Sequence, residues 1–278
     1  MRKPAIRAIL GRRLERGWPL QDLSPKQDAV WVRQLIGELE QQGYPTLKIL
    51  RQAGVDKNRL DRQGSRITIA SYAEIFERAA VVTGDGCLGL NFGRTRDLRD
   101  AGLIAYVGLS SATLNDAIKN IHRYRRVFSD AVEVDIDNLD TNGEVHWWFR
   151  CPVSQGTRQY LEFSGANVLT GFRRMAGREL APIRVSFTHP RNAEIAAFEK
   201  VFGCPVEFGR VANSIQFRMS DLQAPLVTND DRLLTILRGH CEDVLSRRRN
   251  RPPSPRQIRS ASSRSTFSTN EGGRAAAG

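Results

Sequence analysis

Along most of the chain, apolar residues recur every three or four positions, which is the spacing of amphipathic helices. The clearest run ends at Gly43, a typical helix stop signal. Two pairs, Ser71 with Glu74 and Thr113 with Asp116, have the spacing of a capping box and indicate helix starts. Spacing and signals together predict helices over residues 30–42, 46–53, 71–83, 113–128, 156–176, 192–202 and 230–248.

Between residues 131 and 151 the pattern changes to an alternation of apolar and polar positions, which is typical of a half-buried strand. Asn142 and Gly143 have the composition of a two-residue hairpin turn, and pairing across that turn sets Ile136 opposite Phe149. Short strands are predicted over residues 183–188, 206–208 and 215–217. We therefore expect an α+β fold, with helices packed around an antiparallel sheet containing a hairpin at 131–151.

Positive charge is concentrated at the two ends of the chain. The sequence has 42 Lys and Arg against 30 Asp and Glu, a net charge of +12. Residues 1–28 contribute +4 and residues 247–278 contribute +7, so the body between them is nearly neutral and does not predict phosphate binding. We expect a disordered basic extension over 1–28, one folded domain over 29–248, and a disordered basic tail over 249–278.

Cysteine spacing and hydropathy indicate how the cysteines are used and in which compartment the protein is found. The four cysteines are widely spaced, which argues against a zinc site and against a disulfide framework. No apolar segment reaches the roughly 18 residues that a membrane span needs, and no secretion signal is evident. We expect a cytoplasmic protein that does not contact membranes. The Arg-rich start could also be an amphipathic targeting helix.

No pattern in the sequence predicts catalysis, a cofactor or a metal site. Residues 84–89 match the dinucleotide-binding motif G-x-G-x-x-G, but a helix precedes them where the motif requires a strand, so a helix end followed by a turn explains them better. No Gly-x-Ser-x-Gly elbow occurs, and the four histidines are scattered. Among them, His189 precedes a proline, which favours a turn-stabilising imidazole over a metal ligand.

Six segments, read in order, resemble the N-terminal sensor domain of AraC-type transcription regulators, a domain often called arabinose-binding-like. The resemblance covers about residues 30–248, and its most specific parts are "FGCPVEFG" and "GLSSATL". The segments are "LRQAGVDKNRLDRQGSRI" (50–67), "TGDGCLGLNFG" (83–93), "GLIAYVGLSSATLNDAI" (102–118), "VSFTHPR" (185–191), "FGCPVEFG" (202–209) and "PLVTNDDRLL" (225–234).

The resemblance implies that residues 29–248 form a sensor and dimerisation domain for a small-molecule effector of unknown identity. It also implies a homodimer that regulates transcription through a C-terminal module with two helix-turn-helix motifs. Only 28 residues follow Asn250, and two such motifs do not fit there. We therefore identify no DNA-binding residues, and expect DNA binding only if the chain is joined to a helix-turn-helix domain that this sequence lacks.

A truncated or frameshifted gene is the leading explanation for the missing module, because the tail has the composition of out-of-frame translation. The alternative is a stand-alone protein that binds a small molecule and acts through protein partners. Two helix-turn-helix patterns in another reading frame beyond the gene's 3′ end would favour the first, and their absence the second. The basic tail could neutralise nucleic-acid phosphates without reading bases, or serve as a solvated linker.

Aromatic side chains near the predicted hairpin are the candidates for an effector pocket. Trp147 and Phe149 lie on its second strand, Tyr160 follows in the next helix, and His189 follows a later strand. Aromatic side chains can present a flat apolar surface to a ligand, which makes these four residues the predicted effector pocket. Packing in the core is the competing interpretation, since sheet aromatics are usually buried.

Overall fold

The computed structural model describes residues 25–149, 157–191 and 193–249. The end of the predicted hairpin at Cys151, the first residue of the helix predicted over 192–202 and most of both basic ends therefore lie outside the described residues. The helices are α2 (Val30–Gln41), α3 (Thr46–Gln52), α4 (Lys57–Leu60), α5 (Ile69–Thr83), α6 (Leu88–Thr95), η1 (Leu98–Ala101), α7 (Leu103–Leu109), α8 (Leu114–Tyr124), η2 (Arg125–Val127), α9 (Leu139–Asn142), α10 (Arg158–Ala176), α11 (Ile195–Phe202), α12 (Met219–Leu222) and α13 (Asp231–Arg249).

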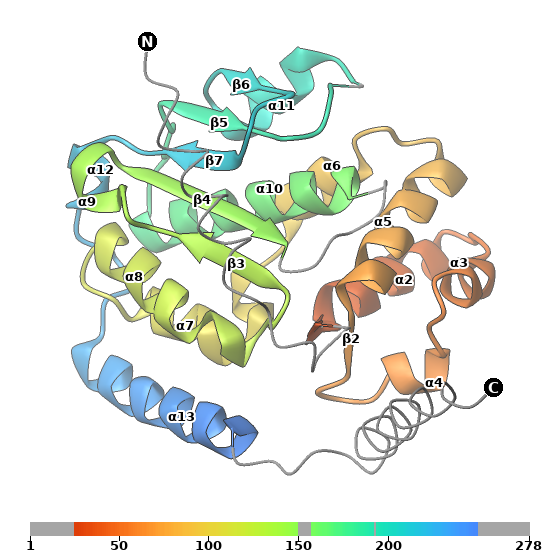
Figure 1. Cartoon of the computed structure of the whole chain (residues 1–278), viewed down its shortest axis with the longest axis horizontal. Helices are drawn as coiled ribbons and strands as arrows, with labels where there is room; N and C mark the ends of the chain where they lie inside the picture. Colours follow the sequence, from red (N-terminus) through yellow and green to blue (C-terminus); the bar gives the residue numbers. More distant parts are fainter. Residues whose placement is uncertain (1–24, 150–156, 192, 250–278) are drawn as a thin grey trace, which may run out of the picture. The chain divides into compact units, whose positions relative to one another are not determined.

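Two sheets accompany these helices, and the fold is α+β as predicted (Figure 1). A small antiparallel sheet joins β1 (Lys26–Asp28) to β2 (Arg66–Thr68). The larger sheet has the strand order β3-β4-β7-β5-β6, and only its β5–β6 pair is parallel. Its strands are β3 (Val132–Asp135), β4 (Glu144–Phe149), β5 (Arg184–Ser186), β6 (Val206–Glu207) and β7 (Asn213–Gln216).

The predicted register of the hairpin is wrong, although β3 and β4 do pair antiparallel. Val132, not Ile136, lies opposite Phe149. The short helix α9 occupies the connection, where the fully buried Leu139 anchors it and Gly143 ends it with a φ of 75°. The observed register differs from the predicted one by four residues. Because four is an even number, each side chain keeps its predicted face of the sheet, and only its partner on the other strand changes.

Local signals placed some helix ends correctly and others not. Helix α5 begins two residues before Ser71, because Thr68 is its N-cap and accepts a hydrogen bond from the Ser71 amide at 3.1 Å. Thr113 caps α8 as predicted. Gly84 ends α5 in the left-handed conformation, so residues 84–87 form the predicted helix end and turn, but Leu88 and Gly89 already belong to α6, which the prediction missed. Helices α6 and α7 were not among the predicted helices.

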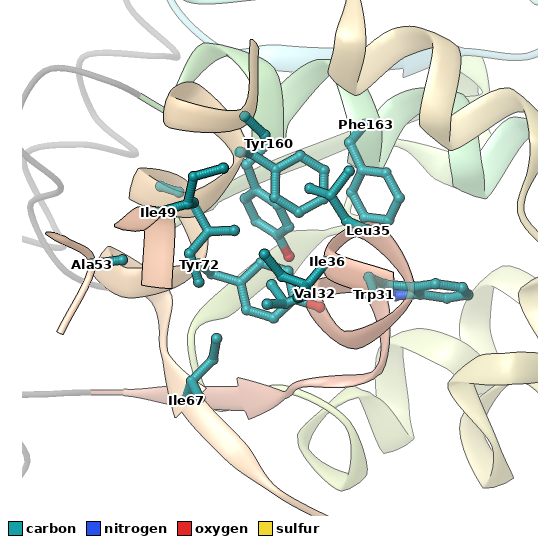
Figure 2. Close-up of a cluster of buried hydrophobic side chains, with 14 of the residues drawn as sticks. Trp31, Val32, Leu35, Ile36, Ile49, Ala53, Ile67, Tyr72, Tyr160 and Phe163 are labelled. Carbon is teal, nitrogen blue, oxygen red and sulfur yellow. The ribbon is translucent and has the colours of Figure 1, made fainter. Parts of the chain in front are cut away.

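Helix α10 separates two hydrophobic cores. Tyr160 and Phe163 belong to the core formed with α2, α3 and α5, and Figure 2 shows them facing Tyr72 and the apolar side of α2. Leu161 and Leu169, on other sides of the same helix, belong to the core against the larger sheet. Of the 19 residues of α10, 13 are buried, so this helix is covered on most of its circumference.

Helices α6 and α10 approach each other at backbone distance. Gly89 and Gly93 of α6 lie against the backbone of α10, at Gln159 and Phe163 respectively. A Cβ atom at either glycine would collide with a carbonyl oxygen of α10, which cannot move without displacing the helix. The sequence needs glycine here because of the close helix packing and not because of an unusual φ.

We expect Gly89→Ala to lower the free energy of unfolding by at least about 2 kcal/mol, because the added methyl group overpacks the α6–α10 contact. Gly37→Ala is the matched control, since a methyl group added at this position of α2 meets nothing within 4 Å. This control should raise the free energy of unfolding by about 0.5–1 kcal/mol through helix propensity. Urea unfolding followed by circular dichroism measures both, and equal effects would contradict the close approach.

Candidate functional site

The first turns of α10 place an ion pair inside the domain. Arg158 and Glu162 are four residues apart and therefore lie on the same side of the helix. Arg158 Nη1 lies 3.3 Å from Glu162 Oε1. The Glu162 side chain is fully buried, whereas the Arg158 side chain is 18% exposed. A buried carboxyl group is costly to maintain unless it is paired or hydrogen-bonded, which makes Glu162 the most unusual side chain of this helix.

His189, which follows β5 in the chain, approaches the same carboxyl group. Its Nε2 atom lies 3.7 Å from Glu162 Oε1 and has no hydrogen-bond partner within the described residues. Its Nδ1 atom lies 3.0 Å from the carbonyl oxygen of Pro190 and can donate to it, as a turn-stabilising imidazole would. With the proton on Nδ1, Nε2 presents a lone pair toward Glu162.

Burial shifts the protonation of both groups toward the neutral form. Burial raises the pKa of Glu162 to about 7, while the charge of Arg158 opposes this shift and Glu77 and Asp85 add to it. Burial also lowers the pKa of His189. Near neutral pH, a small change in the surroundings of Glu162 is therefore enough to change its charge.

Gln159 fixes this end of α10 to the connection between α5 and α6. Its side chain donates to the carbonyl oxygen of Gly86 at 2.9 Å and accepts from the amide of Gly89 at 2.6 Å. Arg158 also donates to the Gly86 carbonyl oxygen, at 2.8 Å. The backbone amide of Gln159 donates to Glu77 of α5 at 2.7 Å. Arg158 and Gln159 therefore tie the start of α10 to α5, to α6 and to the connection between them.

Aromatic rings surround the imidazole. The ring centroid of Phe187 lies 5.1 Å from that of His189 and 6.1 Å from that of Trp147. The ring of Phe208 lies 5.5 Å from that of His189. The indole Nε1 of Trp147 is buried and has no hydrogen-bond partner within the described residues. It is therefore a donor that a bound molecule could satisfy.

We define the Glu162 cluster as Arg158, Glu162, His189, Trp147 and Phe187. It combines a carboxyl group that can be neutral or charged near pH 7, an indole donor, an imidazole nitrogen and an aromatic surface. Such a set can bind a small molecule that carries both polar groups and an apolar face.

The four residues of the predicted effector pocket do not converge on one point. Trp147 and His189 both contact Phe187 and belong to the Glu162 cluster. Phe149 and Tyr160 instead stack on each other, with centroids 5.3 Å apart. Tyr160 also donates to Gln27 of β1 at 2.7 Å, inside the helical core. The geometry thus separates the four into two pairs, and their role in effector binding stays a prediction.

Arg158 and Glu162 were absent from the predicted site. A signal for them exists in the sequence, because Glu162 interrupts the apolar residues Leu161 and Phe163 in a helix that is otherwise buried there. An acidic residue at such a position, four residues after an arginine, indicates a buried ion pair. The partnership with His189 has no local signal, since it joins residues 27 positions apart in the chain.

The described residues contain neither a candidate metal site nor a helix suited to cross a membrane. Within residues 25–149, 157–191 and 193–249, no group of three or more His, Cys, Asp or Glu side chains could hold a metal ion. None of the helices in this described part combines the length and the hydropathy of a membrane span.

Comparison with known proteins identifies relatives among transcription regulators. The sequence model of the family described as the arabinose-binding domain of AraC transcription regulators, N-terminal, matches residues 43–226. The ornithine utilization regulator of Pseudomonas aeruginosa is 22% identical over 228 residues, which span 82% of this chain and 67% of that protein. The family and this relative are transcription regulators and not enzymes.

A solved structure shares the fold. The crystal structure of the transcriptional regulator CdpR from Pseudomonas aeruginosa matches with a TM-score of 0.51 at 18% identity. The match covers 82% of this chain and 75% of CdpR. At this identity the similarity extends to the fold alone.

Because the folded pKa of Glu162 lies above that of an unfolded glutamate, the native state retains a proton that the unfolded state has lost between about pH 4.5 and 7. The contribution of Glu162 to stability should therefore fall as pH rises through this window, by up to about 1.4 kcal/mol per pH unit, and level off above it. Urea unfolding from pH 5 to 8 measures this contribution as the difference between the wild type and Glu162→Gln. A difference that is constant with pH would contradict the raised pKa.

Proposed function

The chain belongs to the family of AraC transcription regulators through their N-terminal arabinose-binding domain, and on this premise we propose that it senses a small-molecule effector with the Glu162 cluster. The observation that carries the proposal is a buried carboxyl group 3.7 Å from His189 Nε2, together with the buried Trp147 Nε1 on the other side of the Phe187 ring; neither nitrogen has a hydrogen-bond partner among the described residues. A buried polar atom left without a partner costs about 1–3 kcal/mol. A ligand that supplies the missing partners recovers this free energy on binding.

The names of the family and of the relative suggest which compounds to test first. The family description refers to arabinose, and the relative's name refers to ornithine. Both compounds are small and rich in hydrogen-bonding groups. A hydroxyl group can accept from the Trp147 indole and donate to Glu162, and an ammonium group can pair with the Glu162 carboxylate.

Dimerisation is the second part of the proposal. On α13, Ile236 is 69% exposed and Leu233 is 38% exposed, although both are large apolar side chains. They lie three residues apart and therefore share one side of the helix. Exposed apolar side chains on one helix face are typical of a contact surface, and a second copy of the chain would present the same side chains in a symmetric dimer.

The described residues do not account for DNA binding. We propose that sequence-specific DNA binding requires a helix-turn-helix module beyond the described residues, as the family's regulators use. The prediction that the tail lacks such a module stays a prediction, because residues 250–278 are not described. A stand-alone sensor that acts through protein partners remains the alternative function, and it would use the same effector site.

We expect a thermal-shift screen of amino acids, amines and sugars, starting with L-ornithine and L-arabinose, to identify a compound that raises the melting temperature of the wild type. Trp147→Phe removes the indole donor together with part of the ring system, and Glu162→Gln removes the charge and replaces one acceptor oxygen with an amide donor. Each should weaken binding of that compound by about tenfold, because a hydrogen bond to a buried group is lost.

Arg210→Gln is the control for this experiment, because Arg210 is an exposed residue of the β6–β7 connection. It should leave the affinity unchanged. A compound that stabilises the wild type, Trp147→Phe and Glu162→Gln equally binds elsewhere, and that result would place the effector site outside the Glu162 cluster.

We expect the wild type to be a dimer in sedimentation velocity at tens of micromolar, and Ile236→Glu to weaken its dimerisation by at least about tenfold through a buried charge. Thr235→Glu places the same charge on the neighbouring, exposed position of α13 and should have little effect. A monomeric wild type, or equal loss in both variants, would contradict a dimer contact at Ile236.

A further inference from the structure

The start of α13 is joined to the end of α7 by three hydrogen bonds. Thr228 donates from its hydroxyl to the carbonyl oxygen of Leu109 at 2.5 Å. The side-chain amide of Asn229 and the backbone amide of Asp230 both donate to the carbonyl oxygen of Ser110, at 3.3 Å and 3.2 Å. These bonds satisfy carbonyl groups that a helix end otherwise leaves free, and they fix the direction in which α13 begins.

A cleft of about 590 Å³ opens beside this joint. This volume is within the range of small-molecule sites, and most of the exposed lining is apolar. Helix α7 contributes Tyr106, which is 42% exposed, and α13 contributes Leu233. The third wall is α10, where Gly171 lets Leu98 of η1 lie directly against the helix.

Two guanidinium groups at the cleft share one carboxylate. Asp97 accepts from the Arg99 side chain at 2.5 Å, and Arg174 Nη1 lies 3.5 Å from the same carboxylate oxygen. The Arg99 amide also donates to Asp97, at 2.9 Å, which holds the carboxylate in place. The Arg99 and Arg174 side chains remain 62% and 47% exposed. The charged groups that line the cleft therefore sum to one net positive charge, with guanidinium donors that face solvent.

We propose that this cleft binds a small amphipathic anion, a carboxylate or sulfonate on an apolar body. The anionic group pairs with Arg174 and Arg99, because a guanidinium group matches a planar or tetrahedral oxyanion with two donors. The apolar body lies against Tyr106, Leu98 and Leu233. An uncharged ligand of the same shape lacks the first of these contacts and binds more weakly.

The cleft is separate from the Glu162 cluster, since the two share no residue. Its occupant contacts α13 through Leu233 and lies beside the Thr228 hydrogen bond, so it stabilises the observed direction of α13. The proposed ligand is thus a second, regulatory molecule and not the effector of the proposed sensor site.

Isothermal titration calorimetry with 4-phenylbutyrate and with 4-phenylbutanol tests the site, because these probes share an apolar body and differ in charge. We expect 4-phenylbutyrate to bind with one-to-one stoichiometry, at least about tenfold more tightly than the alcohol. Arg174→Gln and Arg99→Gln should each weaken binding of 4-phenylbutyrate by about tenfold and leave binding of the alcohol unchanged.

Two controls separate this site from others. Arg210→Gln removes an exposed arginine outside the cleft, and Glu162→Gln alters the proposed sensor site, so both should retain wild-type affinity for 4-phenylbutyrate. Circular dichroism melting verifies that each variant is folded. If Arg174→Gln is unfolded, Arg99→Gln alone tests the contribution of a guanidinium group. A loss of affinity in Glu162→Gln alone would assign the anion to the Glu162 cluster and overturn the proposal.

If neither 4-phenylbutyrate nor naphthalene-2-sulfonate shows saturable binding up to about 10 mM, the proposal of an anion site in the cleft is also overturned. Co-sedimentation with phosphatidylglycerol vesicles tests the other source of an amphipathic anion, a lipid. Binding to vesicles without one-to-one binding of the free probes would overturn the assignment of a small soluble ligand.

Discussion

Burial of α10 on most of its circumference is the constraint on which the rest of the domain depends. Tyr160 and Phe163 serve the helical core, and Leu161 and Leu169 serve the core against the sheet, so neither core is complete without this helix. A helix in this position cannot turn a polar face to water. Most polar side chains on its buried sides therefore pair inside the protein, as Gln159 does with the α5–α6 connection and Glu162 does with Arg158.

The same constraint explains the unusual chemistry of Glu162. Its helix brings the carboxyl group into the interior, where burial favours the neutral form. Among the described residues, the Arg158 guanidinium and the His189 imidazole lie close enough to respond to its charge. Leucine or glutamine of similar volume would avoid this cost, so the carboxyl group is not explained by stability alone.

Much of the fold follows from local patterns, but the candidate site does not. The spacing of apolar residues predicted α2, α3, α8, α10 and α13, because in each of them apolar residues recur at helical intervals. It missed α6 and α7, which are short and contain glycine at close contacts such as Gly93. The hairpin register failed because α9 occupies a connection that the turn rule assigns to two residues.

The approach of His189 to Glu162 depends on tertiary packing between β5 and α10, and the sequence spacing of these residues carries no trace of it. Trp147 and His189 both contact Phe187, whereas Phe149 and Tyr160 stack in the helical core, and nothing in the sequence pattern separates the two pairs. The contact of α6 with α10 at Gly89 and Gly93 has a mechanical consequence: because α6 lies against the α10 backbone at Gln159 and Phe163, α10 cannot shift toward α6 there unless α6 shifts with it. Glu162 and Gly171 are nine residues apart on α10, about 14 Å along its axis, so one uninterrupted helix connects the Glu162 cluster to the cleft beside α13.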